Sequence, residues 1–231
     1  DGSLTASGQF QVTVFNQAPV ANPDTVTVQK GIATNIPVLA NDQDPNGDAI
    51  SVNAIDETAE KATVAKVTVS GVDQVQYTSI DKIGTDTFYY NNKDNEGLVS
   101  ANKALVTVTI LNTAPVANGD SYSVYWNTTT VFTVLVNDDD INPGDKQILE
   151  IVAVSAPSNG GSASSSDKKT ISYSPARGFT GTETFTYTVK DRYDTSAPAT
   201  VTVTVVNPAP VANPDTATKH HALPSINIDV L

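Results

Sequence analysis

The stretch PVLANDQDPNGDAIS crowds oxygen-bearing side chains into a single turn that follows an apolar run. Four of these residues fall at alternate positions: Asp42, Asp44, Asn46 and Asp48. Alternate residues of a curling loop can point their oxygens at one centre, and Gly47 permits the sharp turn that this requires. Carboxylate and amide oxygens are the ligands of hard cations such as Ca²⁺, so the chemistry that this loop offers is cation binding.

The spacing matches the first half of an EF-hand calcium loop, which reads D-x-D-x-N-G-D. The second half does not match, because Asn53 stands at the twelfth place, where an EF-hand needs a bidentate Glu. The flanking residues read as strands rather than helices, so we exclude a true EF-hand. Two interpretations remain: a cation site of another geometry, or an ordinary solvent-facing turn, since Asp and Asn favour turns by bonding to their own backbone.

Acidic residues recur at matching places in a second copy of this loop, NDDDINPGD, which carries one inserted residue, Pro143. Two further acidic positions are repeated, one at the end of the motif NxAPVAxxD and one at the end of a segment that begins with Gly-Thr. The repeated carboxylates are Asp24, Asp42, Asp44 and Asp94 in the first copy and Asp120, Asp138, Asp140 and Asp191 in the second. Carboxylates that gather at one end of a domain repel one another unless a cation neutralises them. Because the sequence has no cysteine and only two histidines, the cofactor that we predict is Ca²⁺.

These acidic positions are held by a tandem repeat. The motifs NQAPVANPD, NTAPVANGD and NPAPVANPD begin at Asn16, Asn112 and Asn207, which are 96 and 95 residues apart. The pairs VLANDQD with VLVNDDD and GTDTFYYNNKD with GTETFTYTVKD keep nearly the same offset, and several anchors in register indicate internal repeats. We divide the chain into two full repeats, 17–112 and 113–207, with 1–16 as the last strand of a preceding repeat and 208–231 as the start of a truncated third. The chain is then expected to be a segment of a longer array.

Within each repeat the hydrophobic pattern has the period of a β-strand. The segments DTVTVQ, VTVTIL and VTVTVV alternate Val or Ile with Thr, whereas helical spacing is absent. Turn signals such as Asn46-Gly47 come every few residues. About seven short strands in about 95 residues are typical of an immunoglobulin-like sandwich, so we predict an all-β chain of tandem sandwiches. We expect Tyr90 and Tyr187 to bond back to nearby backbone, as in the tyrosine corner of such folds.

Charge and composition exclude several classes of partner. The 231 residues carry a formal net charge of -12, and the pI is about 4.3. So acidic a surface repels nucleic acid and anionic lipid, and we predict no nucleic-acid partner. No stretch approaches 18 consecutive apolar residues, so we predict no direct membrane insertion of this segment.

The motifs NxAPVAxxD and VLxNDxD, with GFTGTETFTYTVKD and the closing ATVTVTVVN, resemble bacterial cadherin-like or immunoglobulin-like tandem repeats of large secreted surface adhesins. Repeats of the VCBS type and the extender domains of RTX adhesins belong to this group. The resemblance covers essentially the whole chain, although the first repeat has SIDKIG where the second has SPARGFTG.

The resemblance implies an extended stalk of cadherin-like domains at the bacterial cell surface. The segment would be an extracellular, non-catalytic spacer that projects a distal binding domain for cell adhesion or biofilm formation. It also implies that Ca²⁺ stiffens the domain junctions. Carried over by position, Asn112 and Asp120 would then act with Asp138, Asp140 and Asp191, and Asn16 would act with the matching acids of the first repeat. The expected partners are neighbouring repeats of the same chain.

Two other functions compete with this interpretation. An enzyme is disfavoured because His220 and His221 are adjacent, and adjacent strand residues point to opposite faces. A carbohydrate-binding sandwich is the alternative function. Tyr122 and Tyr125 cluster with Trp126, the single Trp, and could stack host or biofilm polysaccharide. Packing of these aromatic side chains against protein is the alternative interpretation of the same cluster.

Overall fold

A computed structural model describes residues 8–13, 15–56, 59–212, 214 and 216. The chain separates into two compact units. Unit 1 contains Asp1–Val116 together with Asp139–Leu149 and Lys190–Ser196, and unit 2 contains Ala117–Asp138, Glu150–Val189 and Ala197–Leu231. Two loops of the second repeat therefore belong to unit 1. We call Asp139–Leu149 the acidic loop and Lys190–Ser196 the hairpin loop.

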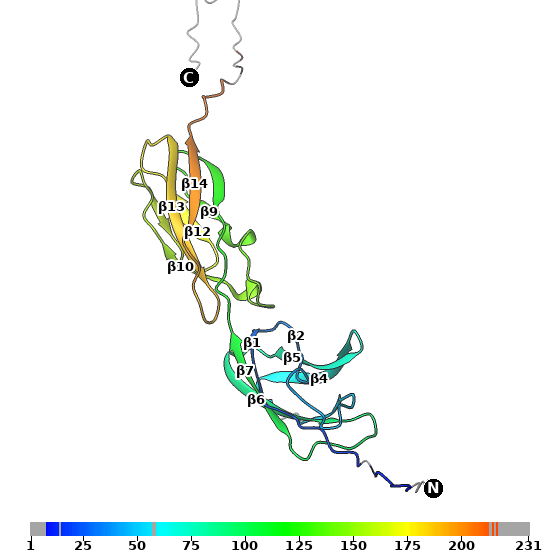
Figure 1. Cartoon of the computed structure of the whole chain (residues 1–231). Helices are drawn as coiled ribbons and strands as arrows, with labels where there is room; N and C mark the ends of the chain where they lie inside the picture. Colours follow the sequence, from blue (N-terminus) through cyan, green and yellow to red (C-terminus); the bar gives the residue numbers. More distant parts are fainter. Residues whose placement is uncertain (1–7, 14, 57–58, 213, 215, 217–231) are drawn as a thin grey trace, which may run out of the picture. The chain divides into compact units, whose positions relative to one another are not determined.

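Unit 1 contains two β-sheets (Figure 1). The four-stranded sheet has the order β1 (Asp24–Gln29), β7 (Ala104–Leu111), β6 (Gly84–Lys93) and β3 (Ser51–Asp56). In this sheet β1 pairs with β7 in parallel, and the other pairs are antiparallel. The three-stranded sheet has the order β2 (Thr34–Ile36), β5 (Val72–Ser79) and β4 (Ala62–Val69), all antiparallel.

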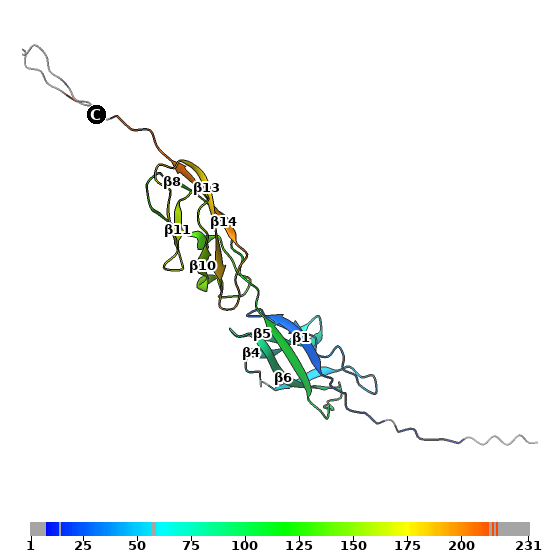
Figure 2. The same cartoon turned by 90° about the vertical axis from the view of Figure 1, so that its left-hand side faces the viewer.

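Unit 2 repeats this topology (Figure 2). Its four-stranded sheet has the order β8 (Asp120–Tyr125), β14 (Ala199–Val206), β13 (Gly181–Lys190) and β10 (Glu150–Val154). The strands β9 (Thr130–Phe132), β12 (Ile171–Ser174) and β11 (Ser162–Ser164) form the three-stranded sheet. Two short 3₁₀ helices occur in the second repeat, η1 (Val134–Val136) and η2 (Lys146–Ile148).

Period-two burial explains why these segments form strands. In β7 the residues Ala104, Val106, Val108 and Ile110 are buried, and the residues between them are more exposed. The matching strand β14 buries Ala199, Val201, Val203 and Val205. β-Branched side chains fit such half-buried faces well. The predicted all-β class is confirmed: each unit is an immunoglobulin-like β-sandwich. The core of unit 1 gathers buried residues from both of its sheets, and unit 2 buries apolar residues of both its sheets as well.

The Tyr90 hydroxyl bonds to a backbone carbonyl, as predicted for a tyrosine corner, but the prediction that this carbonyl lies nearby in the sequence is wrong. The Tyr90 hydroxyl lies 2.6 Å from the carbonyl oxygen of Val38, which is 52 residues earlier in the sequence rather than nearby. Asp86, the acid four residues before Tyr90 in the same strand, accepts a 2.7 Å hydrogen bond from the hydroxyl of a different tyrosine, Tyr77. In unit 2 the matching acid, Glu183, accepts a hydrogen bond from the Tyr173 hydroxyl.

The end segments complete the description. Residues 8–13, which belong to the predicted last strand of a preceding repeat, form no secondary structure. A β-strand is stable only when it pairs with other strands. Residues 1–7 and 217–231, with His220 and His221, lie outside the described residues, so the expected partial repeats stay predictions there. In the described part of the chain, no helix has the length and apolar character needed to span a membrane.

Candidate metal centre

The repeated linker motif is tied to the acidic turn by the same contacts in both repeats. The Asn22 backbone N–H donates to Asp42 Oδ1 at 2.7 Å, and its side-chain amide donates to the Asn41 carbonyl at 2.8 Å. In the second repeat the Asn118 backbone N–H donates to Asp138 Oδ1 at 2.8 Å, and its side chain donates to the Asn137 carbonyl at 2.8 Å. The side chains of Asn41 and Asn137 in turn donate to the carbonyls of Pro23 and Gly119, so the asparagines of both motifs hold this turn against the linker.

A buried tyrosine anchors one aspartate of each turn. The Tyr90 hydroxyl is 2.8 Å from Asp42 Oδ2, which also accepts a 2.9 Å hydrogen bond from the Asn92 side chain. In unit 2 the Tyr187 hydroxyl is 2.8 Å from Asp138 Oδ1. The oxygens of Asp42 thus already accept three protein donors, which is the arrangement of a structural carboxylate.

A second carboxylate lies beside each anchored aspartate. Burial, and then the charge of Asp42, raise the pKa of Asp24 to about 6. Burial likewise raises the pKa of Asp120, and the charge of Asp138 adds to the effect. We call Asp24 with Asp42, and Asp120 with Asp138, the inner pairs. The raised pKa values of Asp24 and Asp120 follow from burial and from the neighbouring carboxylate in the same partly buried place.

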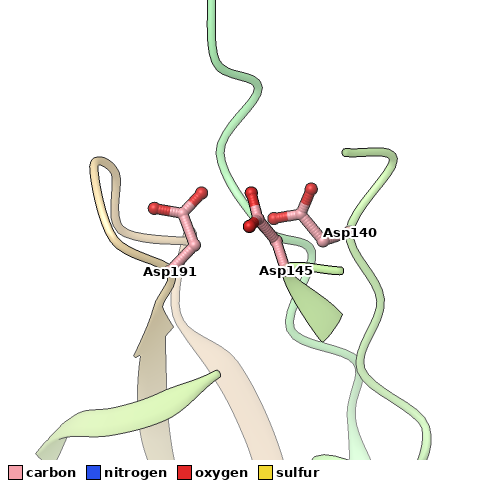
Figure 3. A group of neighbouring side chains, drawn as sticks. All are labelled: Asp140, Asp145 and Asp191. Atoms are coloured by element: carbon pink, nitrogen blue, oxygen red, sulfur yellow. The ribbon is translucent and has the colours of Figure 1, made fainter. Parts of the chain in front are cut away.

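The remaining acids form a different group. In unit 1 one carboxylate oxygen from each of Asp140, Asp145 and Asp191 lies within 4.8 Å of the others (Figure 3). The acidic loop supplies Asp140 and Asp145, and Asp191 is in the hairpin loop, just after β13 ends. Oxygens on a shell of Ca²⁺ ligands, at about 2.3–2.6 Å from the ion, are separated by up to about 5 Å. The spacing of the three carboxylates therefore fits a common cation.

Asn112, the first residue of the linker motif, completes this group. Its side-chain N–H donates to Asp191 Oδ2 at 2.7 Å and to Asp194 Oδ2 at 2.8 Å. Its carbonyl oxygen Oδ1 is buried without a hydrogen-bond partner, and so is Asp140 Oδ2. Buried polar oxygens are rarely left without a partner. Two such oxygens from distant segments, beside clustered carboxylates, are the arrangement expected of ligands for a cation.

Backbone donors already neutralise part of the charge of this group. Burial opposes ionisation of Asp191, but donors from Asp194, Asn112 and Tyr193 outweigh it and lower its pKa. Asp140 receives fewer donors, and its pKa is raised by burial and by the charges of Asp145 and Asp191. A backbone hydrogen bond from Asn142 and the charge of Lys30 oppose this rise in the pKa of Asp140 without cancelling it. We call Asn112, Asp140, Asp145 and Asp191 the Asn112 cage.

The first repeat shows part of the same pattern, although among the described residues only Asp140, Asp145 and Asp191 bring three carboxylate oxygens within 4.8 Å of one another. The Asn16 side-chain N–H donates to Asp94 Oδ2 at 2.7 Å, as Asn112 does to Asp191. Asn16 Oδ1 and Asp44 Oδ2 are buried without a hydrogen-bond partner, which repeats the pattern of Asn112 and Asp140. Asp48 stands where the second copy has Asp145, and it lines an open hollow beside Asn16. We call Asn16, Asp44, Asp48 and Asp94 the Asn16 cage.

Comparison with known proteins identifies the family. A family model described as a bacterial Ig domain matches residues 16–109 and again residues 112–204. The chain belongs to the bacterial Ig domain family. Bacterial Ig domains are typically non-catalytic and extracellular. A search of curated proteins gave no match.

Solved structures with similar folds to this bacterial Ig chain come from several kinds of protein. Human CDH23 EC21-23 is 16% identical with a TM-score of 0.38, and the alignment covers 80% of this chain and 69% of that one. Human mucin-like protocadherin EC1-2 is 16% identical with a TM-score of 0.36, covering 81% and 98%. The endo-fucoidan hydrolase MfFcnA4 of glycoside hydrolase family 107 is 17% identical with a TM-score of 0.32, covering 81% and 28%. The chain thus spans under a third of that hydrolase, and similarities this low carry no functional argument.

The two bacterial Ig repeats sort the predicted metal ligands into two sets. Asp44, Asp94, Asn112, Asp140 and Asp191 lie in the cages, together with Asn16. Asp24, Asp42, Asp120 and Asp138 lie in the inner pairs. Asp145 belongs to the Asn112 cage but was absent from the ligand set drawn from the sequence. The sequence could have pointed to Asp145, because in the second acidic turn it occupies the place that Asp48 has in the first.

The aromatic cluster of the second Ig repeat contains one core residue and two exposed residues. Tyr122 stacks on Phe132 with a ring-centroid distance of 4.0 Å, so its ring is part of the core packing of unit 2. Tyr125 and Trp126 remain exposed, by 59% and 38%. The three-residue sugar platform considered from the sequence is therefore reduced to two neighbouring side chains.

Proposed function

We propose that this chain is a calcium-binding spacer segment of a large extracellular surface protein of bacteria. The observation that carries the proposal is the repetition of the cage. In both Ig repeats an Asn at the start of the linker motif donates to an Asp after the Gly-Thr strand, and in both an Asn oxygen and an Asp oxygen stay buried without a partner.

The chemistry of the donors supports Ca²⁺. Each cage offers only carboxylate and amide oxygens, and the chain has no cysteine. Calcium accepts six to eight such oxygens in irregular geometry, which suits ligands from a linker, an acidic loop and a hairpin loop. In the Asn112 cage the ligands would be Asn112 Oδ1, Asp140 Oδ2 and a carboxylate oxygen of Asp191, with Asp145 beside them.

The mechanical role follows from where these ligands stand in the chain. Asn112 immediately follows β7, whereas Asp140 and Asp191 are in loops of the next repeat. A cation bound by all three would crosslink the linker to both loops and restrict its backbone dihedral angles. The linker sequence NTAPVAN also lacks the Gly and Ser content of a flexible tether, which supports the same role.

The biological setting is an inference from the family and the tandem arrangement. Successive Ig repeats of one chain would act as partners of each other, and calcium would limit bending at each linker. Such a segment would hold a distal binding domain away from the bacterial cell surface for adhesion or biofilm formation. Stiffness, rather than ligand recognition or catalysis, would be its contribution.

Calcium titration of the 231-residue chain by isothermal calorimetry, with small-angle scattering in Ca²⁺ and in EDTA, tests this proposal. We expect saturable binding, a higher melting temperature in Ca²⁺ and a narrower distribution of interatomic distances. Mg²⁺ at the same concentration is the control for simple charge screening, because it demands a tighter octahedral shell. Absence of Ca²⁺ binding at millimolar concentration would refute the proposal.

A further inference from the structure

Lys30 is an unusual lysine, because only 2% of its surface is exposed. It follows β1 directly, and its Nζ lies 2.7 Å from Asp145 Oδ1 and 2.5 Å from Asp145 Oδ2, within unit 1. A third carboxylate oxygen, Asp81 Oδ1, is 3.0 Å away. Lysine is almost never fully buried unless it is paired. The ammonium group of Lys30 is thus a cation built into the edge of the Asn112 cage.

The surroundings fix Lys30 in this place. Its backbone N–H donates to the Leu111 carbonyl at 2.8 Å, and its own carbonyl accepts a 2.9 Å hydrogen bond from the side chain of Asn142. The ring centroid of Tyr193, in the hairpin loop, is 5.3 Å from the ammonium nitrogen. Lys30 therefore contacts both the acidic loop and the hairpin loop, and its side chain has little freedom to leave.

The Asn16 cage differs at this point. In the described part of the chain, no Lys or Arg side chain forms an ion pair with Asp48, which stands at the place of Asp145. Both cages repeat the hydrogen bond from the Asn side chain to the Asp after the Gly-Thr strand, and both contain one Asn oxygen and one matching Asp oxygen without a hydrogen-bond partner. Asp140, Asp145 and Asp191 each carry a negative charge, and Lys30 places one positive charge against Asp145, which it shares with Asp81. Asp194 accepts a hydrogen bond from Asn112, and Arg192 pairs with Asp81, so Lys30 reduces the negative charge of the Asn112 cage without neutralising it.

We propose that Lys30 acts as a tethered cation that replaces part of the metal charge in the Asn112 cage. The part of this inference that concerns Ca²⁺ affinity rests on the proposed function. The ammonium group holds the acidic loop to the end of β1 in the absence of calcium, and it lowers the affinity of the same cage for Ca²⁺. The two cages thereby differ in their calcium requirement: the Asn16 cage is ordered by metal alone, whereas the Asn112 cage keeps a metal-independent clasp.

The direction of the effect separates this role from ordinary packing. Removing the ammonium group raises the negative charge of the cage, so Ca²⁺ binds more tightly, by about tenfold for a like charge a few ångströms away in a partly screened site. The same change leaves the buried carboxylate of Asp145 unpaired in EDTA, so the acidic loop is less well held. A lysine that only filled space would weaken metal binding when it is lost, because the cage would loosen.

The test is a calcium titration of the full chain carrying Lys30→Met, in a background of Asp44→Asn that disables the Asn16 cage. Lys103→Met is the matched control, since it makes the same substitution at an exposed pair, 2.9 Å from Asp56, in unit 1. We expect Lys30→Met to tighten Ca²⁺ binding about tenfold and Lys103→Met to leave it unchanged. Equal affinity in both variants, or weaker binding in Lys30→Met, would overturn the proposal.

Amide hydrogen exchange in EDTA tests the metal-independent half. Lys30→Met should speed exchange of residues 139–149, and Lys103→Met should not. Adding Asp145→Asn to Lys30→Met removes the unpaired carboxylate and should restore part of the protection. Unchanged exchange in Lys30→Met would refute the clasp. If the parent chain binds no Ca²⁺, the proposed function fails, while the exchange experiment still decides the role of Lys30 without metal.

Discussion

The side-chain amide of Asn112 donates to Asp191 at 2.7 Å, across 79 residues of sequence. Asn16 and Asp94 form the same 2.7 Å bond across 78 residues in the first repeat. In each case the amide N–H is used and the amide oxygen is left buried without a partner. The bond therefore fixes the amide so that its N–H is used by the carboxylate and its oxygen is left without a protein donor. Under the proposed function, that oxygen is a calcium ligand.

Loss of a carboxylate from the Asn112 cage should remove the part of the calcium response that this cage contributes. Asp140→Asn leaves the backbone contacts of the loop possible but replaces the unpartnered carboxylate oxygen by an uncharged amide. Ligand at 100 times its dissociation constant stabilises a folded state by about 2.7 kcal/mol, and most of this should be lost for the Asn112 cage. Scanning calorimetry in Ca²⁺ and in EDTA measures the difference. Asp139→Asn, at an exposed neighbouring position, is the control and should keep the full response.

The tyrosine anchors should contribute stability whether or not calcium is present. Tyr187→Phe removes the hydroxyl that lies 2.8 Å from Asp138 Oδ1 and 2.9 Å from the Asn118 carbonyl. Leaving such buried acceptors without a donor costs about 1–3 kcal/mol. Urea unfolding in EDTA should show this loss. The exposed Tyr125→Phe in the same unit should change the unfolding free energy by less than about 0.5 kcal/mol, and a similar loss in both variants would contradict the anchoring role.

The period-two pattern was sufficient to predict the strands and the core, because burial alternates along β7 and β14 just as Val alternates with Thr. The sequence did not predict which acids belong to the inner pairs and which belong to the cages. Asp42 and Asp44 are two residues apart, yet Asp42 Oδ2 accepts a hydrogen bond from the Tyr90 hydroxyl, whereas Asp44 Oδ2 is buried without a hydrogen-bond partner. That choice is made by tertiary partners, which the local spacing of oxygens does not encode.

Lys30 shows the same limit more strongly. It is one lysine at the end of a strand, and its partner Asp145 is 115 residues away. In the second repeat the same place is occupied by Trp126, so the internal repeat gives no second example of the contact. By contrast, the cages could be predicted in outline, because their acids recur at matching positions in two copies of the repeat.

The inner pair of unit 1 should make stability depend on pH. The pKa of Asp24 rises from 3.8 in a free residue to about 6 in the fold, so the folded state binds this proton more tightly than the unfolded chain does. The stability contributed by Asp24 is therefore complete below about pH 4 and is lost as the pH rises through 6. Asp24→Asn should be more stable than the parent at pH 8 by about 1 kcal/mol. The pKa shift alone corresponds to about 3 kcal/mol, which is discounted because the group is partly accessible to solvent.

Urea unfolding of both proteins in EDTA, at several values between pH 4 and pH 8, checks this sign. The advantage of Asp24→Asn should shrink toward zero below about pH 4, where the parent carboxyl is neutral in both states. Asp56→Asn, at an exposed salt bridge with Lys103, is the control and should show no such gain at pH 8. A constant difference between Asp24→Asn and the parent at all pH values would rule out titration of Asp24 as its cause.

Gly31 offers a test of how closely the acidic loop approaches the end of β1. Its φ of +73° is unfavourable for any residue with a side chain, and an added Cβ would lie 3.0 Å from Cδ of Pro143. Gly71 has a similar φ of +84° but open space around it. Both Gly→Ala variants should therefore lose about 1 kcal/mol to backbone strain. Gly31→Ala should in addition push Pro143 away, so it alone should increase amide exchange in residues 139–149 and weaken the calcium response. Equal behaviour of the two variants would mean that the contact with Pro143 does not hold the loop.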